Sequence, residues 1–245
     1  MCINDQGCSI STVDKTCSVI FEETPRYHMA TYAATACKEG ESYIGDSYSF
    51  GRIKDGSYIT IISDGMGSGA LAGKDSKAAV ELIERFKEAG FCSSTAINTL
   101  NSILAMRFDE EEKFSTLDLN SVDLYSGEAV FMKIGADSSF IRRGKKVEEI
   151  TSKTLPIGVL EKPDVDKTSK ILKNGDLIIS VSDGILESNT SSKVKASWLK
   201  DFLSENQNSN PKELVNEILE RAKELSGGRA KDDMTVLVSK LYEIF

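Results

Sequence analysis

The chain of 245 residues has few of the side chains that serve as nucleophiles or soft metal ligands. It has five cysteines, an odd number, and none forms a Cys-x-x-Cys pair, so neither a disulfide framework nor a cysteine zinc site is expected. No arginine lies six positions after a cysteine, which excludes the phosphate-binding loop of cysteine-dependent phosphatases. We expect reduced and mostly buried thiols at Cys2, Cys8, Cys17, Cys37 and Cys92.

Histidine is scarcer still, because His28 is the only one. A single histidine cannot build a metal site of several imidazoles, and any Ser-His-Asp mechanism would depend on this residue alone. His28 lies in the strand-like run Tyr27 to Ala36, where we expect a packed or surface role for it.

Long apolar runs are also missing. The longest, such as Ile59 to Ile62 and Leu177 to Val181, are far shorter than the roughly 20 residues that span a bilayer. Residues Met1 to Thr16 lack the basic start and apolar stretch of a signal peptide. We therefore expect a cytoplasmic chain that makes no membrane contact of its own.

Positive charge is outnumbered, with 30 lysines and arginines against 38 aspartates and glutamates and a formal net charge of −8. Because the field of such a molecule repels phosphate backbones, no nucleic-acid partner is expected. Carboxylates are plentiful instead, and several of them stand at strand ends.

Strand-like runs recur along most of the chain and are joined by short polar turns. The turns at 54–57, 125–128, 143–145 and 173–176 contain glycine and suit strands that pair as antiparallel neighbours. The expected strands are Tyr27–Ala36, Ser47–Ile53, Tyr58–Ser63, Leu117–Leu124, Ala129–Ile134, Phe140–Arg142, Lys146–Ile150, Leu177–Val181 and Thr235–Leu241.

Helical periodicity interrupts the strands in two regions. Ala79, Ile83 and Phe86 recur at helical spacing, and Asn210-Pro211 has the composition of a helix start. Many antiparallel strands with a few clustered helices indicate an α+β fold. The expected helices span about Ala70–Gly90, Thr95–Arg107, Ser197–Leu203 and Asn210–Gly227.

Two apolar strands end in the same tripeptide, Ser-Asp-Gly, at Asp64 and at Asp183. Asp-Gly alone often marks a hairpin turn, yet no obvious return strand follows either one. Two more aspartates, Asp46 and Asp232, also stand at strand ends. Four aspartates converging at one end of a sheet would suit Mg²⁺ or Mn²⁺, which prefer oxygen ligands, whereas each aspartate singly could be a solvated turn residue.

A glycine-rich stretch, 65–76, follows the first Ser-Asp-Gly. It resembles a dinucleotide-binding fingerprint only loosely, because a second helix follows it and Asp64 would repel a pyrophosphate. A phosphate-binding P-loop is excluded, since Ser68 and Asp75 stand where glycine and Ser or Thr are needed. The glycines are better explained by close approach of the backbone, including the Gly65 carbonyl, to an ion.

Together these segments resemble the metal-dependent serine/threonine phosphatases of the PPM (PP2C-like) family, most closely its members from bacterial sporulation. The resemblance covers nearly all of the chain from Tyr27 to Phe245. It rests on Gly45-Asp46-Ser-Tyr-Ser, Ile62-Ser-Asp64-Gly65-Met-Gly67-Ser-Gly69-Ala, Ser115-Thr116-Leu117-Asp118, Leu155-Pro156-Ile157-Gly158, Gly175-Asp176-Leu-Ile-Ile-Ser-Val-Ser-Asp183-Gly184 and Asp232-Asp233-Met234-Thr235-Val236.

The resemblance implies an αββα sandwich for residues 27–245, in which helices cover two antiparallel sheets. Residues 1–26 would be the tail of an upstream regulatory or linker region. The whole protein would be anchored in a membrane through that upstream region, and a homodimer is possible.

The resemblance also implies two Mn²⁺ or Mg²⁺ ions, with Asp64 and Asp183 as catalytic carboxylates. Asp64 would bridge the two ions, Asp46 and the Gly65 carbonyl would complete one site, and Asp183 with Asp232 would complete the other. A water activated by both ions would then attack the phosphorus directly.

The sequence does not identify the residue that binds the substrate phosphate. Better-known members place an arginine four residues before the first acidic ligand, but that position is Ser42 here. The metals alone, or Lys38, would then hold the phosphate. A third metal is equally open, because the run 110–112 of three glutamates gives no clear ligand pattern.

By resemblance, the chain is a protein-serine/threonine phosphatase whose substrate is the phosphoserine of an anti-anti-sigma factor, and whose action releases a sporulation sigma factor. Two alternatives stay open. One is a weak or inactive phosphoprotein-binding module of the same fold, which the presence of all four aspartates disfavours. The other is a two-metal nuclease, which the net charge disfavours.

Overall fold

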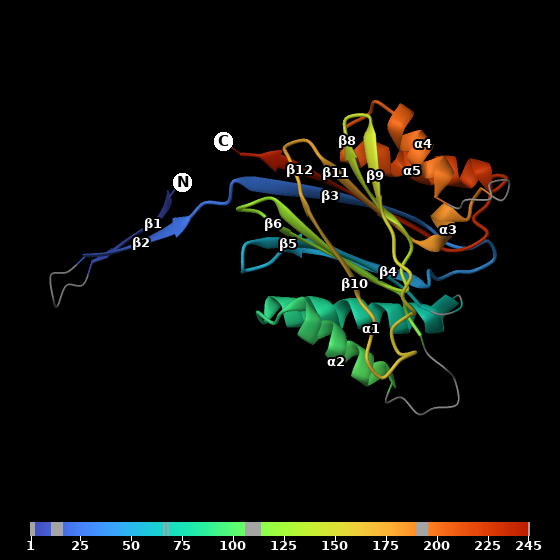
Figure 1. The fold of residues 1–245 in the computed structure, drawn as a ribbon, viewed down its shortest axis with the longest axis horizontal. Helices are drawn as coiled ribbons and strands as arrows, with labels where there is room; N and C mark the ends of the chain where they lie inside the picture. The colour runs from blue at the N-terminus through green and yellow to red at the C-terminus, as the bar shows by residue number, and fades with distance from the viewer. Residues whose placement is uncertain are drawn as a thin grey trace.

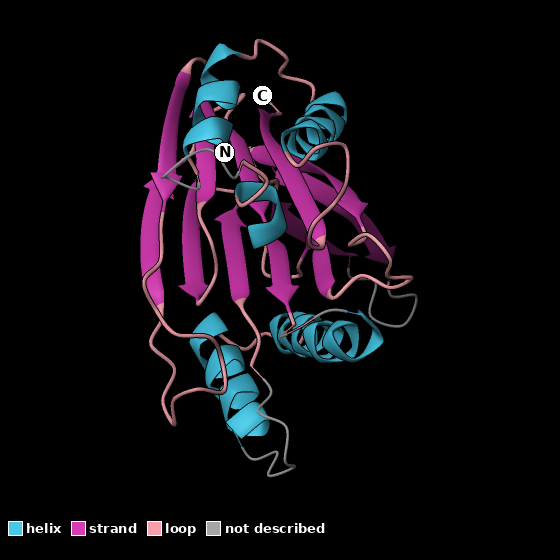
Figure 2. Ribbon diagram, turned by 90° about the vertical axis from the view of Figure 1, so that its right-hand side faces the viewer, coloured by secondary structure: helices cyan, strands magenta, loops and turns pink. Residues whose placement is uncertain are grey.

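A computed structural model describes residues 3–10, 17–65, 67, 69–105, 114–189 and 196–244. Two antiparallel sheets face each other in the middle of the molecule, and helices cover the outer face of each (Figure 1). Figure 2 shows the same layers after a turn of 90°. This is the αββα sandwich of the α+β class that the sequence predicts.

The two large sheets have five strands each, and we name them after their central strands. The β6 sheet has the order β10-β7-β6-β5-β4, with β4 (Asp46–Arg52), β5 (Ser57–Asp64), β6 (Leu117–Asp123), β7 (Glu128–Ile134) and β10 (Asp166–Ile171). The β11 sheet has the order β3-β12-β11-β8-β9, with β3 (Tyr27–Ala36), β8 (Ser139–Arg143), β9 (Lys146–Ile150), β11 (Leu177–Val181) and β12 (Met234–Glu243).

The helices divide between the sheets. On the β6 sheet lie α1 (Gly69–Glu88) and α2 (Ser93–Ala105), and on the β11 sheet lie α3 (Asp183–Leu186), α4 (Ser197–Glu205) and α5 (Pro211–Leu225) (Figure 1). The start of α5 is capped as its sequence predicts, because the Asn210 side chain accepts a hydrogen bond from the Lys212 N–H. In the part of the chain that is described, no helix is long and apolar enough to cross a membrane.

Three apolar layers stabilise the sandwich, one under each group of helices and one between the sheets. Side chains alternate along β5, so Ile59 and Ile61 face α1 and α2 while Tyr58 faces the other sheet. Because both faces of β5 and β11 are covered, these strands are almost wholly buried and mostly apolar.

The expected strands and helices are found with small shifts at their ends, and the expected end of α2 at Arg107 lies outside the described residues. Within the sandwich, β10 was not predicted, because it is a polar edge strand with alternating exposure. The prediction for the turn at 173–176 was wrong: it joins β10 in one sheet to β11 in the other, so it connects two layers and not two neighbouring strands.

The N-terminal segment contains a hairpin that the sequence did not predict. Strands β1 (Ile3–Ile10) and β2 (Cys17–Glu23) pair with each other and extend away from the sandwich (Figure 1). That residues 1–26 are the tail of an upstream region stays a prediction.

The structure describes the side chains of two cysteines and of the histidine. Cys37 and Cys92 are free thiols as expected, but Cys37 is half-buried and Cys92 exposed, so the expected burial was wrong for both. The side chains of Cys2, Cys8 and Cys17 lie outside the described part. His28 is an exposed residue stacked on Tyr242 of the neighbouring strand, with ring centroids 5.3 Å apart, which confirms a surface role.

Asn101 on α2 is buried and ties the helix to the loop that follows β9. Its Nδ2 donates to the carbonyls of Leu160 (2.9 Å) and Glu161 (3.1 Å), and its Oδ1 accepts from the Gly158 N–H (3.0 Å). Asn101→Ala removes all three hydrogen bonds. We expect it to lower the free energy of unfolding by about 2 kcal/mol in urea denaturation.

The matched control is Asn98→Ala, at an exposed position of the same helix with the same gain in helix propensity. We expect a change below about 0.5 kcal/mol there. Equal effects at the two positions would show that the Asn101 hydrogen bonds add no stability.

Candidate metal and phosphate site

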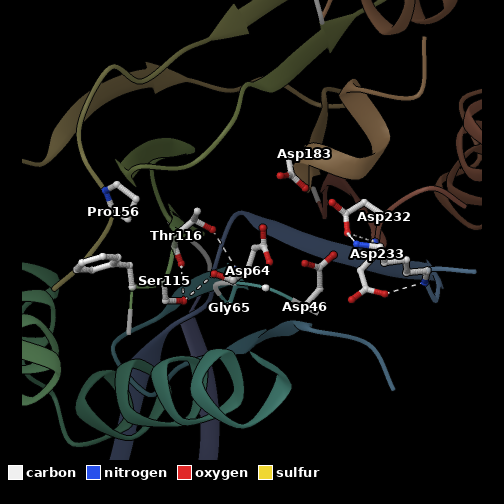
Figure 3. A pocket seen from close by; sticks show the side chains of 12 residues that line it. Asp46, Asp64, Gly65, Ser115, Thr116, Pro156, Asp183, Asp232 and Asp233 are labelled. Carbon is white, nitrogen blue, oxygen red and sulfur yellow. Dashed lines mark hydrogen bonds and ion pairs between the residues drawn. The ribbon is translucent and has the colours of Figure 1, made fainter. Parts of the chain in front are cut away.

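An open cavity of about 330 Å³ lies where ends of the two large sheets meet, and carboxylates from both sheets line it (Figure 3). The sequence predicted four aspartates at one end of one sheet. The structure brings the four together, but two belong to each sheet, so the cavity lies between the layers. Its lining comprises Lys38, Asp46, Asp64, Gly65, Gly67, Phe114, Ser115, Thr116, Pro156, Asp183, Asp232 and Asp233.

The β6 sheet supplies Asp46 at the start of β4 and Asp64 at the end of β5, and the two residues are direct cross-strand partners. Their side chains therefore point to the same face, toward the other sheet. Gly65 follows, and α1 passes so close that any side chain there would clash with the Ala72 carbonyl. Glycine at 65 thus lets the helix lie directly behind the site.

The β11 sheet supplies Asp183 and Asp232 from two neighbouring strands. Asp183 begins α3 just after β11, and Asp232 stands just before β12. Gly184 plays the same part as Gly65, because a side chain there would clash with the Asp233 carbonyl. In each Ser-Asp-Gly tripeptide, the chain thus turns out of a buried strand and the aspartate of the tripeptide faces the cavity.

Asp233 is a residue whose role the sequence analysis missed. It is buried, and its two carboxylate oxygens accept from the N–H groups of Lys38 (2.8 Å) and Gly45 (2.6 Å). It therefore ties the connection before β4 to the start of β12, and so holds Asp46 near Asp232. The sequence feature that could have indicated this role is the pair of adjacent aspartates at 232–233.

Ser115 and Thr116 form a second support that sequence reasoning did not assign. The Ser115 Oγ donates to the Asp64 carbonyl (2.9 Å), and the Thr116 N–H donates to the same oxygen (2.9 Å). The Asp64 N–H in turn donates to Thr116 Oγ1 (3.0 Å). These bonds fix the backbone of Asp64 and leave its carboxylate facing the cavity (Figure 3).

Burial, reinforced by the neighbouring carboxylates, raises the pKa values of the cavity aspartates. Burial, reinforced by the nearby carboxylates of Asp46, Asp183 and Asp232, raises the pKa of Asp64 to about 9. Burial and the neighbouring Asp232 raise the pKa of Asp183 to about 7, and burial raises that of Asp46 to about 6. A protein without a bound cation therefore keeps protons here that ordinary aspartates lose.

These residues suit a hard divalent cation. The donors are carboxylates, and Asp46 Oδ2 is a buried oxygen without a hydrogen-bond partner. Within the described residues, no three carboxylate, thiol or imidazole groups already surround one point as a closed metal site would. The aspartate side chains would therefore have to turn toward the ion, which can replace the protons that the raised pKa values retain.

The remaining predicted residues are placed as follows. Lys38 lines the cavity, and its Nζ lies 3.5 Å from Asp232 Oδ1. Glu110, Glu111 and Glu112 lie outside the described residues. His28, on the edge strand β3, is not among the residues that line the cavity.

The family described as stage II sporulation protein E (SpoIIE) matches residues 54–242. The chain belongs to the SpoIIE family. It is 38% identical over 223 residues to stage II sporulation protein E of Bacillus subtilis and 39% identical over 225 residues to that of Priestia megaterium. These matches cover 91% and 92% of this chain but only 27% and 38% of the two SpoIIE proteins.

Solved structures agree with the SpoIIE assignment. The structure of the PP2C phosphatase domain of Bacillus subtilis SpoIIE with a fragment of its regulatory domain superimposes with a TM-score of 0.87 at 36% identity. That match covers 97% of this chain and 70% of the other. RsbX, solved in complex with magnesium, shares the fold at a TM-score of 0.66 and 22% identity, covering 90% of this chain and 98% of RsbX.

The crowded carboxylates predict a pH-dependent stability for the metal-free protein. The folded state retains protons on Asp64 and Asp183 that the unfolded chain releases near its ordinary aspartate pKa, so stability falls as the pH rises toward about 9. Asp64→Asn removes a carboxyl group that must keep its proton on folding, so it removes this cost. In EDTA at pH 8 we expect it to melt a few degrees higher than the unmodified protein, about 1 kcal/mol of added stability.

The control is Asp164→Asn, at an exposed position away from the cavity lining, which should leave the melting temperature unchanged. If Asp64→Asn melted lower than the unmodified protein at pH 8, the burial and crowding of the Asp64 carboxyl would not be what lowers stability at this pH.

Proposed function

We propose that the chain is a protein-serine/threonine phosphatase that depends on Mn²⁺ or Mg²⁺. The observation that carries the proposal is the cluster of four aspartates, contributed by both sheets, around one open cavity in the fold of a PP2C phosphatase domain. Carboxylates held this close together repel one another, and bound cations would neutralise that repulsion.

Each residue then has a distinct task. Asp46, Asp64 and the Gly65 carbonyl would hold one ion, and Asp64, Asp183 and Asp232 would hold the second. Two such ions supply an activated water and neutralise phosphoryl oxygens, so direct hydrolysis needs no cysteine or histidine nucleophile. Ser115 and Thr116 keep Asp64 in place, and the Lys38 ammonium binds the substrate phosphate at the mouth of the cavity.

The substrate class is a phosphoserine or phosphothreonine on another protein. An open cavity gives a side chain on a protein surface access to the carboxylates. RsbU of Bacillus subtilis, 24% identical over 198 residues, is named a phosphoserine phosphatase. We propose a phosphorylated anti-anti-sigma factor as the substrate, with activation of a sporulation sigma factor as the outcome.

The whole protein is proposed to be longer than this chain, which spans about a third of its SpoIIE relatives. We propose that an upstream region anchors it in a membrane and that it forms a homodimer, while this chain itself stays in the cytoplasm.

One observation favours a second candidate function. Because no three described side chains already enclose an ion, the same fold could bind a phosphoprotein with weak or no turnover. Turnover in the presence of added metal separates the two functions.

We expect dephosphorylation of a phosphoserine protein to require added Mn²⁺ or Mg²⁺, measured as phosphate release. Asp64→Asn and Asp183→Asn should each lower the rate by at least about 100-fold, because an amide supplies no negative charge to a dication. Asp164→Asn should keep the rate of the unmodified protein. Full activity in excess EDTA contradicts the metal requirement, and unmodified rates in both cavity variants contradict the assignment of the ligands.

Lys38 gives a separate prediction about substrate binding. Lys38→Met keeps most of the side-chain volume and removes the charge, so we expect KM for the phosphoprotein to rise about 5- to 10-fold with a smaller change in kcat. Lys54→Met, in the exposed turn between β4 and β5, should change neither constant. An unchanged KM in Lys38→Met would leave phosphate binding to the metals alone.

A further inference from the structure

A network of polar side chains lies buried between the two large sheets, next to the cavity. Its members come from β5, β6 and β7 of the β6 sheet and from β8 and β11 of the β11 sheet, and none is more than 3% exposed. We call it the inter-sheet network. It consists of Thr60, Asp118, Asn120, Lys133, Ser139 and Ser180.

The centre of the network is a buried ion pair. Lys133 and Asp118 are cross-strand partners on β7 and β6, with Nζ 2.9 Å from Oδ2. The same Nζ donates to Ser139 Oγ (2.9 Å) and to the Asp137 carbonyl (2.6 Å). The lysine charge is thus neutralised inside the sandwich, and its remaining donors reach the other sheet and the turn between β7 and β8.

Besides the Lys133–Ser139 hydrogen bond, two more hydrogen bonds of the network cross directly from sheet to sheet. Ser139 Oγ donates to Asp118 Oδ2 (2.5 Å), and Asn120 Nδ2 donates to Ser180 Oγ (2.8 Å). Farther from the cavity the layer between the sheets is mostly apolar, with residues such as Val122 and Leu241, although Thr31 and Ser239 are also buried polar residues. The network therefore supplies directional contacts, hydrogen bonds, between the two sheets at the end that faces the cavity.

The network adjoins both pairs of cavity aspartates along the chain. Asp118 is two residues from Thr116, which exchanges hydrogen bonds with the Asp64 backbone. Ser180 lies on β11, three residues before Asp183, which follows the end of that strand. A displacement of one sheet against the other would therefore move Asp64 relative to Asp183.

Apolar contacts resist such a displacement only weakly, because they have no preferred direction. A buried ion pair adds little net stability compared with apolar residues of the same volume, but its hydrogen bonds permit one arrangement only. The network is thus suited to fixing the position of one sheet against the other more than to raising stability.

We propose that Lys133, Asp118 and Ser139 are positioning residues that set the separation between the two pairs of cavity aspartates. The inference rests on the proposed function, because that separation matters when both pairs bind one cluster of cations. It predicts that metal affinity and fold stability respond differently when the network is replaced by apolar side chains.

The test is the triple variant Lys133→Met, Asp118→Leu and Ser139→Ala, which leaves no buried charge unpaired. We expect the melting temperature in EDTA to stay within a few degrees of the unmodified protein. The Kd for Mn²⁺, measured by calorimetry, should rise by about 10-fold or more, the usual effect of losing groups that orient metal ligands. A network with a purely structural role would leave the Kd of the folded protein unchanged.

The control replaces a different ion pair, at the opposite end of β11 from Asp183. Arg143 Nε donates to Asp176 Oδ1 there (2.9 Å). Arg143→Met with Asp176→Leu should alter stability without altering the Kd for Mn²⁺.

If the triple variant does not fold, Ser139→Ala alone decides the matter, with an expected rise in Kd of about 3-fold. An unchanged Kd in the folded triple variant, or in Ser139→Ala where the triple variant fails to fold, overturns the positioning role. A failure of the unmodified protein to bind Mn²⁺ overturns the proposed function instead.

Discussion

Hydrogen bonds between the β6 and β11 sheets hold the two halves of one carboxylate cluster against each other. The layer between the sheets is apolar around Val122 and Ala129, becomes polar at Asn120 and Ser180, and opens into the cavity at Asp64. Asp46 and Asp64 are cross-strand partners within one sheet, while Asp183 and Asp232 flank neighbouring strands of the other. The geometry of the whole cluster therefore depends on how the sheets are packed, and the three apolar layers supply the stability that keeps them packed.

The cluster itself opposes folding when no cation is present. Burial and mutual repulsion raise the pKa values of Asp46, Asp64 and Asp183, and Asp46 Oδ2 has no hydrogen-bond partner. A site of this kind stores unfavourable electrostatic energy that a divalent cation can release on binding. The supports around it, Asp233 on one side and Ser115 with Thr116 on the other, hold the backbone while the carboxylates stay crowded.

Sequence reasoning predicted most strands, the longer helices and the α+β class, because periodicity and turn composition are local signals, and the family resemblance added the sandwich. It also predicted that the aspartates at 46, 64, 183 and 232 lie together, through the repeated Ser-Asp-Gly and the family resemblance, while their role as ligands stays a prediction. It placed them on one sheet, since nothing local tells which strands share a sheet, and for the same reason it misjudged the turn at 173–176. The roles of Asp233 and Lys133 depend on partners distant in sequence, which no single-chain pattern encodes.

The central claim, that aspartates from two sheets hold a pair of cations between them, is tested most directly by anomalous diffraction from crystals soaked in Mn²⁺. The account predicts two anomalous peaks in the cavity, one beside Asp46, Asp64 and Gly65 and the other beside Asp64, Asp183 and Asp232. A cavity without peaks at millimolar Mn²⁺, or peaks bound by one sheet alone, would contradict it.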